Sequence, residues 1–197
     1  MNAKRIIALL LTFVLGVTLA GCGKEDNTEL LKGKYKAVIT VENYGEIELE
    51  LDADTAPITV TNFVNLVNDK FYDGLTFHRI IDGFMIQGGD PKGDGTGGSD
   101  KTIKGEFSVN GVENNISHLR GVISMARNGY SYDSASSQFF IVHKDSDFLD
   151  RQYAAFGKVT SGMDVVDAIA EKTPVIDDNG TVKPENQPKI KTVRIVD

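Results

Sequence analysis

Two alternating patterns of apolar and polar residues lie between positions 35 and 51. Residues 35–41 (YKAVITV) form one β-type run, and residues 46–51 (EIELEL) form a second in which every other side chain is apolar. A period of two is typical of a strand with one buried and one exposed face. The intervening Glu42-Asn43-Tyr44-Gly45 has the composition of a turn. The pattern therefore predicts a β-hairpin.

The period changes after residue 56. Apolar side chains recur at spacings of three and four, which predicts a helix of about four turns with one buried face: Val60, Phe63, Val64, Val67 and Phe71. The preceding Asp54-Thr55-Ala56-Pro57 offers polar cap candidates and a proline near the first turn. A shorter helix is expected at 163–170, with Val165, Val166 and Ile169 facing inward.

Short β-type runs alternate with glycine-rich loops up to about residue 160, and a final strand is expected at 190–196. The chain has 20 glycines and no tryptophan, as in many β proteins with tight turns. Its 197 residues suit one domain, expected over residues 35–197. The elements together predict a mainly β fold, with an antiparallel sheet whose ends are covered by helices.

An apolar run precedes these elements. Lys4 and Arg5 are followed by residues 6–20, which are almost wholly apolar but shorter than the roughly 20 residues of a spanning helix. This charge order is typical of a secretory signal. The run ends in Leu19-Ala20-Gly21-Cys22, which resembles the lipobox of bacterial lipoproteins. That resemblance implies cleavage before Cys22 and diacylglycerol on its sulfur.

We therefore expect a lipoprotein-type signal peptide over residues 1–21 and a lipid-anchored flexible tether over residues 22–34. Cys22 is the only cysteine in the chain, so it has no partner for an internal disulfide. Two acyl chains suit stable anchoring, because one chain alone is marginal. The expected location is extracytoplasmic, on the cell membrane. Ordinary cleavage after Ala20 is the alternative, and it gives a soluble secreted protein with a free thiol.

The charge balance excludes one class of partner. The formal net charge is −7, and removal of Lys4 and Arg5 with the signal leaves 19 basic and 28 acidic residues, a net charge of −9. Nucleic-acid binding requires basic patches, so we expect no such partner. Attachment of the protein to the membrane is then expected to depend on lipid rather than on a basic surface.

Three stretches hold the candidate chemistry: residues 77–90 (FHRIIDGFMIQGGD), 121–127 (GVISMAR) and 136–141 (SSQFFI), the last followed by FLD at 148–150 and FGKV at 156–159. Arg79 stands among apolar residues, so its guanidinium must be paired or must serve a ligand. In this order and spacing, the stretches closely resemble the cyclophilin family over residues 34–196. The resemblance implies an eight-stranded antiparallel β-barrel closed by two α-helices, with an active groove on its outer face.

The resemblance also implies peptidyl-prolyl cis-trans isomerase activity on proline-containing polypeptides. Rotation about an X–Pro bond breaks amide resonance and takes tens to hundreds of seconds unaided. No bond is made or cut, so the reaction requires a site matched to the twisted bond and no metal or cofactor. The implied catalytic residues are Arg79, as donor to the prolyl nitrogen, with Gln87 and Phe84.

The implied substrate-binding residues form two groups. An apolar pocket for the proline ring comes from Phe84, Met85, Phe140 and Leu149, and a groove for the preceding residue from Gly95, Ala126, Arg127 and Gln138. Gln87 is expected to hold the substrate backbone or to orient Arg79. Phe148 occupies a groove-wall position where many members have tryptophan, which predicts weakened cyclosporin binding. Tyr153 and Arg127 replace a histidine and an asparagine of the family.

Other interpretations receive less support from the residues. A non-catalytic proline-peptide binding module or holdase could dispense with Arg79. A lipid-anchored solute-binding protein would need a longer, two-lobed chain. A hydrolase triad of Ser136 or Ser137 with His143 and Asp145 is not supported, because neither serine lies in a nucleophile elbow. A phosphate-binding loop at residues 93–98 (GDGTGG) would need a following lysine that is absent, so we expect a rim loop there. His78 is expected to support the barrel through hydrogen bonds, with His118 and His143 also structural, and the protein is expected to be monomeric.

Overall fold

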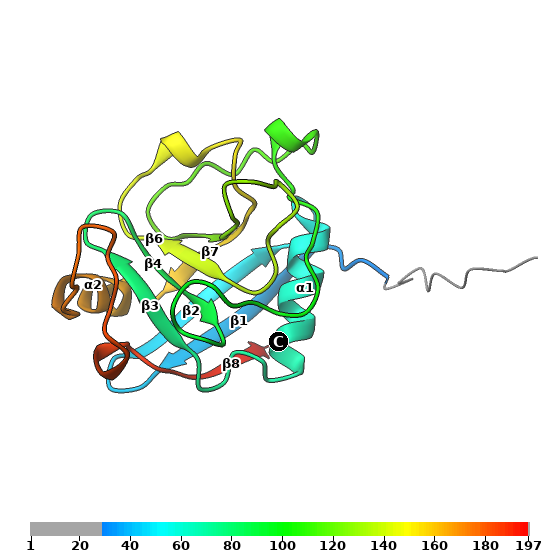
Figure 1. Ribbon diagram of the computed structural model, residues 1–197. Coiled ribbons are helices and arrows are strands. Elements are labelled where there is room, and N and C mark those ends of the chain that lie inside the picture. Colours follow the sequence, from blue (N-terminus) through cyan, green and yellow to red (C-terminus); the bar gives the residue numbers. More distant parts are fainter. Residues whose placement is uncertain (1–28, 197) are drawn as a thin grey trace, which may run out of the picture.

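The computed structural model describes residues 29–196 and contains one curled antiparallel sheet (Figure 1). The strand order is β3-β4-β6-β5-β7-β2-β1-β8, and each neighbouring pair is antiparallel. The strands found in the described residues are β1 (Lys34–Val41), β2 (Gly45–Asp52), β3 (Thr76–Ile81), β4 (Met85–Asp90), β5 (Val122–Met125), β6 (Phe139–Val142), β7 (Ala155–Ser161) and β8 (Ile190–Val196).

The predicted hairpin is confirmed as β1 and β2. Its register pairs Val41 with Gly45, and Gly45 has φ +125°, a conformation that glycine adopts without steric cost. The apolar side chains of β2 at Ile47, Leu49 and Leu51 are buried, whereas the intervening glutamates face outward. The period of two thus fixed both the element and its buried face.

Two α-helices lie at opposite ends of the sheet, α1 (Pro57–Asn68) and α2 (Met163–Lys172) (Figure 1). Both predicted positions are confirmed, although α1 is shorter than four turns and Phe71 lies beyond it. The predicted polar cap is wrong, because Ala56 is the N-cap residue and makes no side-chain bond. The buried carboxylate of Glu106 instead accepts hydrogen bonds from the backbone N–H groups of Ile58 and Thr59, at 2.9 and 2.7 Å.

The eight antiparallel strands and two helices implied by the resemblance are confirmed, but the sheet forms a curled half-barrel rather than a full barrel. The edge strands β3 and β8 share no ladder in the described structure; they meet at an isolated bridge between Thr76 and Lys189 and at nearby backbone bonds. The remaining edge of β3 is covered by residues 175–182, hereafter the strap. The strap N–H of Val182 bonds to His78 O, and the N–H of Ile80 bonds to Gly180 O. These contacts occupy backbone groups that a closing strand would need.

Alternation along the strands separates an inner core from an outer cluster. Ile80, Ile86, Ile141 and Ile123 are paired in one row across β3, β4, β6 and β5, and all belong to the main core. A second, smaller cluster on the outer face contains Met85, Val122, Phe140, Val142, Leu149 and Ala155. Because Phe139 and Phe140 are adjacent on β6, their side chains point to opposite faces. The outer cluster is therefore a direct consequence of the pleat.

The last residues of the predicted tether are bonded to the domain. Leu31 N donates to Thr61 Oγ1 at 2.9 Å, Gly33 N donates to Asp54 Oδ1 at 2.8 Å, and Lys34 already belongs to β1. The expected tether over residues 22–34 is thus corrected at its last residues. The predicted signal peptide, Cys22 and the first part of the tether lie outside the described residues.

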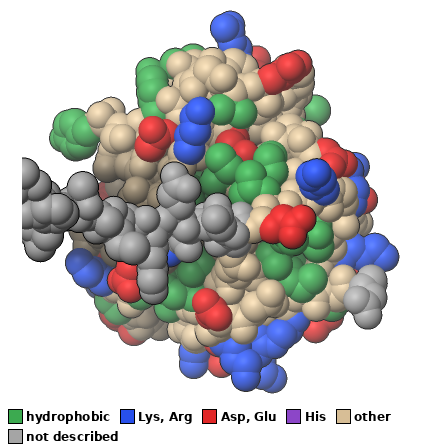
Figure 2. Space-filling view, turned by 90° about the vertical axis from the view of Figure 1, so that its right-hand side faces the viewer, with side chains coloured by type: hydrophobic (Ala, Val, Ile, Leu, Met, Phe, Trp, Pro, Cys, Tyr) green, Lys and Arg blue, Asp and Glu red, His purple; other side chains and the backbone are tan. Residues whose placement is uncertain are grey.

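Surface charge is mixed where it can be seen. On the face shown in Figure 2, acidic and basic side chains are interspersed around exposed apolar ones. None of the helices within residues 29–196 is both long enough and apolar enough to span a bilayer.

Candidate active site

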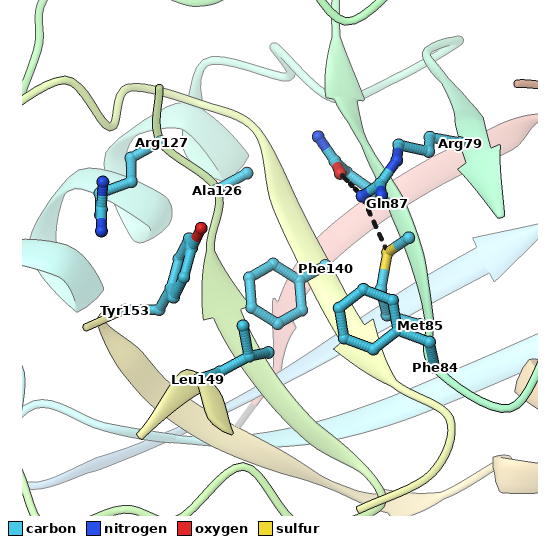
Figure 3. Close-up of a pocket in the computed structure, with 9 residues that line it drawn as sticks. All are labelled: Arg79, Phe84, Met85, Gln87, Ala126, Arg127, Phe140, Leu149 and Tyr153. Carbon is cyan, nitrogen blue, oxygen red and sulfur yellow. Dashed lines mark hydrogen bonds between the residues drawn. The ribbon is translucent and has the colours of Figure 1, made fainter. Parts of the chain in front are cut away.

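A pocket of about 420 Å³ opens on the outer face of the sheet, over β3, β4, β5 and β6 (Figure 3). Most of the residues predicted for the site line it: Arg79, Phe84, Met85, Gln87, Ala126, Arg127, Phe140, Leu149 and Tyr153. Strand register explains their meeting. Arg79 pairs with Gln87, Gln87 with Phe140, and Phe140 with Ser124, so four strands present one row of side chains on the same face.

Arg79 is held at one edge of the pocket by neutral groups. Its Nη1 donates to Gln87 Oε1 at 3.1 Å and contacts the sulfur of Met85 at 3.9 Å, while its Nε donates to the backbone carbonyl of Asn179 at 2.8 Å. It forms no ion pair with a carboxylate among residues 29–196. Burial lowers the pKa of Arg79, but a guanidinium remains protonated at working pH. The side chain is a fixed cationic donor.

A chain of amides connects Arg79 to the rim of the pocket. Gln87 Nε2 donates to Gln138 Oε1 at 2.9 Å, and Gln138 Nε2 donates to the carbonyls of Gly95 and Gly97 at 3.1 and 2.7 Å. Of the two roles expected for Gln87, the orientation of Arg79 therefore has its contact in place. The structure also gives Gln138 a function that its position in the sequence did not indicate, as a link between the site and the rim loop.

The floor of the pocket is apolar. Met85, Phe140 and Leu149 are buried, and the ring of Phe140 packs edge-on against Tyr153, with the ring centroids 5.9 Å apart. Beneath it, the ring of His118 is stacked on Phe140 at 6.0 Å. These contacts hold the Phe140 ring from two sides.

Phe148 lies beside the pocket rather than in its lining. It is 62% exposed, and its ring packs against Phe84 in a tilted arrangement with a centroid distance of 5.4 Å. The predicted groove-wall position is therefore at the rim, where Phe84 connects it to the pocket.

Gly95 and Gln138 line a second hollow of about 750 Å³ that shares Gln87, Ala126 and Arg127 with the first. Its rim is the glycine-rich loop at residues 93–98, as predicted. The buried carboxylate of Asp90 organises this loop by accepting hydrogen bonds from the N–H groups of Lys92 and Gly95 at 2.8 and 2.6 Å.

Arg127 separates the two hollows and is bound to the protein on several sides. Its guanidinium carbon lies 4.7 Å from the ring centroid of Tyr153, 5.1 Å from that of Tyr132 and 5.5 Å from that of Phe107. Its Nε and Nη1 donate to the carbonyls of Gln152 and Asn128. The cation therefore supports the Tyr153 wall from behind, as Figure 3 shows.

The three histidines have different surroundings. His118 is buried and bonds to Asp150 at 2.8 Å and Ser124 Oγ at 3.1 Å; burial lowers its pKa, against the effect of Asp150. Nδ1 of His143 accepts a hydrogen bond from Gly83 N. Both agree with a structural role.

The prediction for His78 is wrong. The ring is buried, and neither nitrogen has a hydrogen-bond partner within residues 29–196. The rejected hydrolase triad is also absent from the described structure. Ser137 Oγ donates to Gly89 O, and Asp145 accepts from Arg120 N, so neither serves His143.

Sequence reasoning missed Asn179 and His118 as parts of the site. Asn179 acts through its backbone carbonyl and lies 100 positions from Arg79, so no side-chain pattern identifies it. His118 lies outside the three stretches that hold the candidate chemistry, and its contact with Phe140 depends on the fold.

Comparison with known proteins agrees with this geometry. The family model for cyclophilin type peptidyl-prolyl cis-trans isomerase/CLD matches residues 36–195. Peptidyl-prolyl cis-trans isomerase B of Bacillus subtilis is 49% identical over 124 residues, 63% of this chain and 82% of its own. A peptidyl-prolyl cis-trans isomerase of Helicobacter pylori is 46% identical over 145 residues, covering 73% and 84%.

A solved structure shows the same architecture. It is that of a Cryptosporidium parvum cyclophilin type peptidyl-prolyl cis-trans isomerase in the presence of the dipeptide Ala-Pro. It superposes with a TM-score of 0.72 at 30% identity and covers 82% of this chain and 99% of its own. Its likeness extends over the half-barrel sheet and both helices. The sequence match and the shared fold together show that the chain belongs to the cyclophilin-type peptidyl-prolyl cis-trans isomerases.

Proposed function

We propose that Arg79 catalyses isomerisation by donating a hydrogen bond to the prolyl nitrogen of a twisted X–Pro bond. In a planar imide, the nitrogen lone pair is delocalised into the carbonyl group. As the bond rotates, the lone pair returns to the nitrogen, which becomes a better acceptor. A donor fixed in advance for that state stabilises it more than either planar form and so lowers the barrier.

The observation that carries this proposal is the position of the Arg79 guanidinium. It lies at the edge of an apolar pocket and is oriented by neutral acceptors, without a carboxylate ion partner in residues 29–196. An ion pair would satisfy the cation and weaken its attraction for a substrate atom. Hydrogen bonds to Gln87 and Asn179 orient it without forming an ion pair.

The apolar floor suits the proline ring. Met85, Phe140 and Leu149 provide a buried surface against which a saturated ring can pack while the polypeptide before it rotates. The related Cryptosporidium protein was solved in the presence of Ala-Pro, which is the same chemical unit. The residue before proline then lies over Ala126 and Gln138, in the second hollow.

We also propose that the clients are exported polypeptides and that the enzyme reaches them from a lipid anchor on Cys22. The support is the charged start, the short apolar run and the Leu19-Ala20-Gly21-Cys22 sequence. Proline isomerisation is slow enough to limit folding outside the cytoplasm as elsewhere. An acidic chain without a polybasic stretch relies on acyl chains for membrane attachment.

Activity is tested on the mature protein with an Ala-Pro peptide, by NMR exchange or a protease-coupled assay. The wild-type protein accelerates interconversion, and Arg79→Ala lowers kcat/KM by about 10²–10³-fold, the typical cost of losing one fixed donor. Lys158→Ala, which removes a surface cation near Glu50, is the control and keeps full activity. Peptide binding without acceleration would instead support a binding module or holdase.

The anchor is tested separately in the producing cell. The full chain enters the membrane fraction and incorporates labelled fatty acid, and Cys22→Ser abolishes both while secreted activity remains. Recovery of unlabelled wild-type protein from the medium would support cleavage after Ala20 and a soluble form.

A further inference from the structure

The strap, residues 175–182, is the least expected neighbour of the active site. It connects α2 to β8, far from the motifs in sequence, and lies along the free edge of β3 (Figure 1). The carbonyl of Asn179 within it accepts the hydrogen bond from Arg79 Nε at 2.8 Å. One loop therefore reaches the cation on which the proposed chemistry depends.

Two contacts fix the plane of the guanidinium. Arg79 is bound through Nε to Asn179 O and through Nη1 to Gln87 Oε1, on different sides of the fork. Its Nη2 makes no hydrogen bond to any residue from 29 to 196. A planar guanidinium held at two nitrogens has no freedom to rotate. The unbonded nitrogen is then presented in one orientation.

The strap is in register with Arg79 itself. An isolated antiparallel bridge pairs Arg79 with Thr181, and on either side Val182 N donates to His78 O at 3.0 Å and Ile80 N donates to Gly180 O at 2.8 Å. The Asn179 carbonyl is thus placed by the backbone of the residue whose side chain it holds. Any displacement of the strap changes the distance between Asn179 O and Arg79 Nε.

The strap keeps its shape through Gly180 and Asp177. Gly180 has φ +80°, and a Cβ atom there would collide with the backbone oxygen of Ile80 and the side chain of Ile81. Gly180 N donates to Asp177 O at 3.0 Å, and the Asp177 carboxylate accepts from Thr181 N at 2.9 Å. A side chain at 180 is therefore excluded by both conformation and space.

We propose that the strap is a positioning element of the isomerase, in which the Asn179 carbonyl orients Arg79 and Gly180 allows the carbonyl to approach. The inference rests on the proposed role of Arg79 as donor to the prolyl nitrogen. A long arginine side chain otherwise samples many rotamers, and ordering it before the substrate arrives removes that entropy cost from the reaction. No residue of the strap lines either hollow of the site, so in this proposal it acts through Arg79.

The principal test is Gly180→Ala, with Gly33→Ala as its matched control. Gly33 also has a positive φ, +82°, but has open space around it, so its variant carries backbone strain without displacing the strap. Gly180→Ala lowers kcat by about tenfold or more while KM changes less than about twofold. Gly33→Ala leaves both constants near wild type. Equal effects of the two variants on kcat would overturn the proposal.

A second variant avoids the steric collision. Asp177→Ala removes the acceptor for Thr181 N and loosens the strap, whereas Asp177→Asn keeps an oxygen acceptor and removes only the negative charge, which also acts on Arg79. The first lowers kcat and the second does not. If Gly180→Ala unfolds the protein, this pair of variants still tests whether the strap positions Arg79. An unchanged kcat in Asp177→Ala would contradict that role.

Two readouts separate positioning from general destabilisation. The Nε–H signal of Arg79 in NMR spectra is protected from exchange in the wild type and loses protection in Gly180→Ala, whether or not a substrate is present. In an Arg79→Lys background, which has no Nε–H, Gly180→Ala has little further effect on kcat. A full additional loss there shows a merely structural effect.

The two proposals fail in different ways. Full activity of Arg79→Ala refutes the proposed donor, while protection of the Nε–H signal still reports on the strap. Loss of activity in Arg79→Ala together with full activity and full protection in Gly180→Ala keeps the donor and refutes the strap.

Discussion

The Oε1 atom of Gln87 lies 3.1 Å from Nη1 of Arg79, across a pair of residues in register on β4 and β3. This contact makes the amide a direct constraint on the cation. Because Nε2 of the same amide is bound to Gln138, the direction in which Gln87 presents its oxygen is also fixed.

Gln87→Ala is expected to lower kcat/KM about tenfold, since one of the two acceptors that orient Arg79 is lost. The measurement is the peptide isomerisation rate, with the free energy of unfolding recorded in parallel. Asn115→Ala, which removes an exposed amide bonded to Glu113, is the control and retains full activity. An unaffected rate in Gln87→Ala would show that Arg79 does not depend on Gln87 for its orientation.

Phe148→Trp is expected to strengthen cyclosporin inhibition by about five- to tenfold while leaving peptide turnover within about twofold. The exposed Phe148 ring already packs against Phe84, and indole adds contact area and an N–H donor at the same place. Inhibition constants of the two proteins, measured with one substrate, test this. Identical constants would mean that the rim residue does not touch the inhibitor.

His78 is expected to make the fold sensitive to acid. Burial is the main cause that lowers its pKa from the ordinary 6.5, and Arg79 acts in the same direction, against Asp90 and Asp94. The unfolded chain therefore takes up the proton first as the pH falls. The free energy of unfolding decreases below about pH 6.5 and continues to decrease until the folded protein is also protonated.

Urea unfolding at about pH 7.5 and about pH 5 checks this prediction, with His78→Leu as the comparison. Leucine removes two buried nitrogens that have no partners in the described structure, so this variant is expected to lose less stability between the two pH values. A pH dependence equal to that of the wild type would assign the acid sensitivity to other groups.

Glu106→Ala is expected to destabilise the protein by about 1–3 kcal/mol, because two N–H groups at the start of α1 lose their acceptor in a buried place. Glu106→Gln is expected to cost less, since its amide oxygen still accepts. Asp54→Ala, at the exposed position where the sequence suggested a cap, is expected to cost least. Thermal or urea unfolding ranks the three, and any other order would contradict the capping assignment.

Local patterns were sufficient for individual elements, whereas the eight-stranded architecture was implied by the family resemblance. The alternation at 46–51 and the three-and-four spacing after Pro57 depend only on neighbours in sequence, so hairpin and helix followed directly. Arg79, Gln87 and Met85 could be assigned together because the contiguous stretch that contains all three resembles the cyclophilin family. The register of β3 and β4 then brought them to one face, as that stretch implied.

Long-range partners could not be read from such patterns. Glu106 caps a helix that begins nearly fifty residues earlier, and Asn179 offers only a backbone oxygen that every residue possesses. The open edge of the sheet depends on where the strap returns, which is a property of the complete topology. Neither ring nitrogen of His78 has a partner in the described structure, and its own sequence context does not reveal this.

The nine side chains that line the pocket include neither a carboxylate nor an imidazole. Turnover should then depend little on the acidity of the medium as long as the protein remains folded. An enzyme proposed to work outside the cell is exposed to changes of pH that the cytoplasm does not buffer. Acid is then expected to affect folding and catalysis in a fixed order. As the pH falls, the folded protein is destabilised through His78 before the catalytic groups themselves are affected.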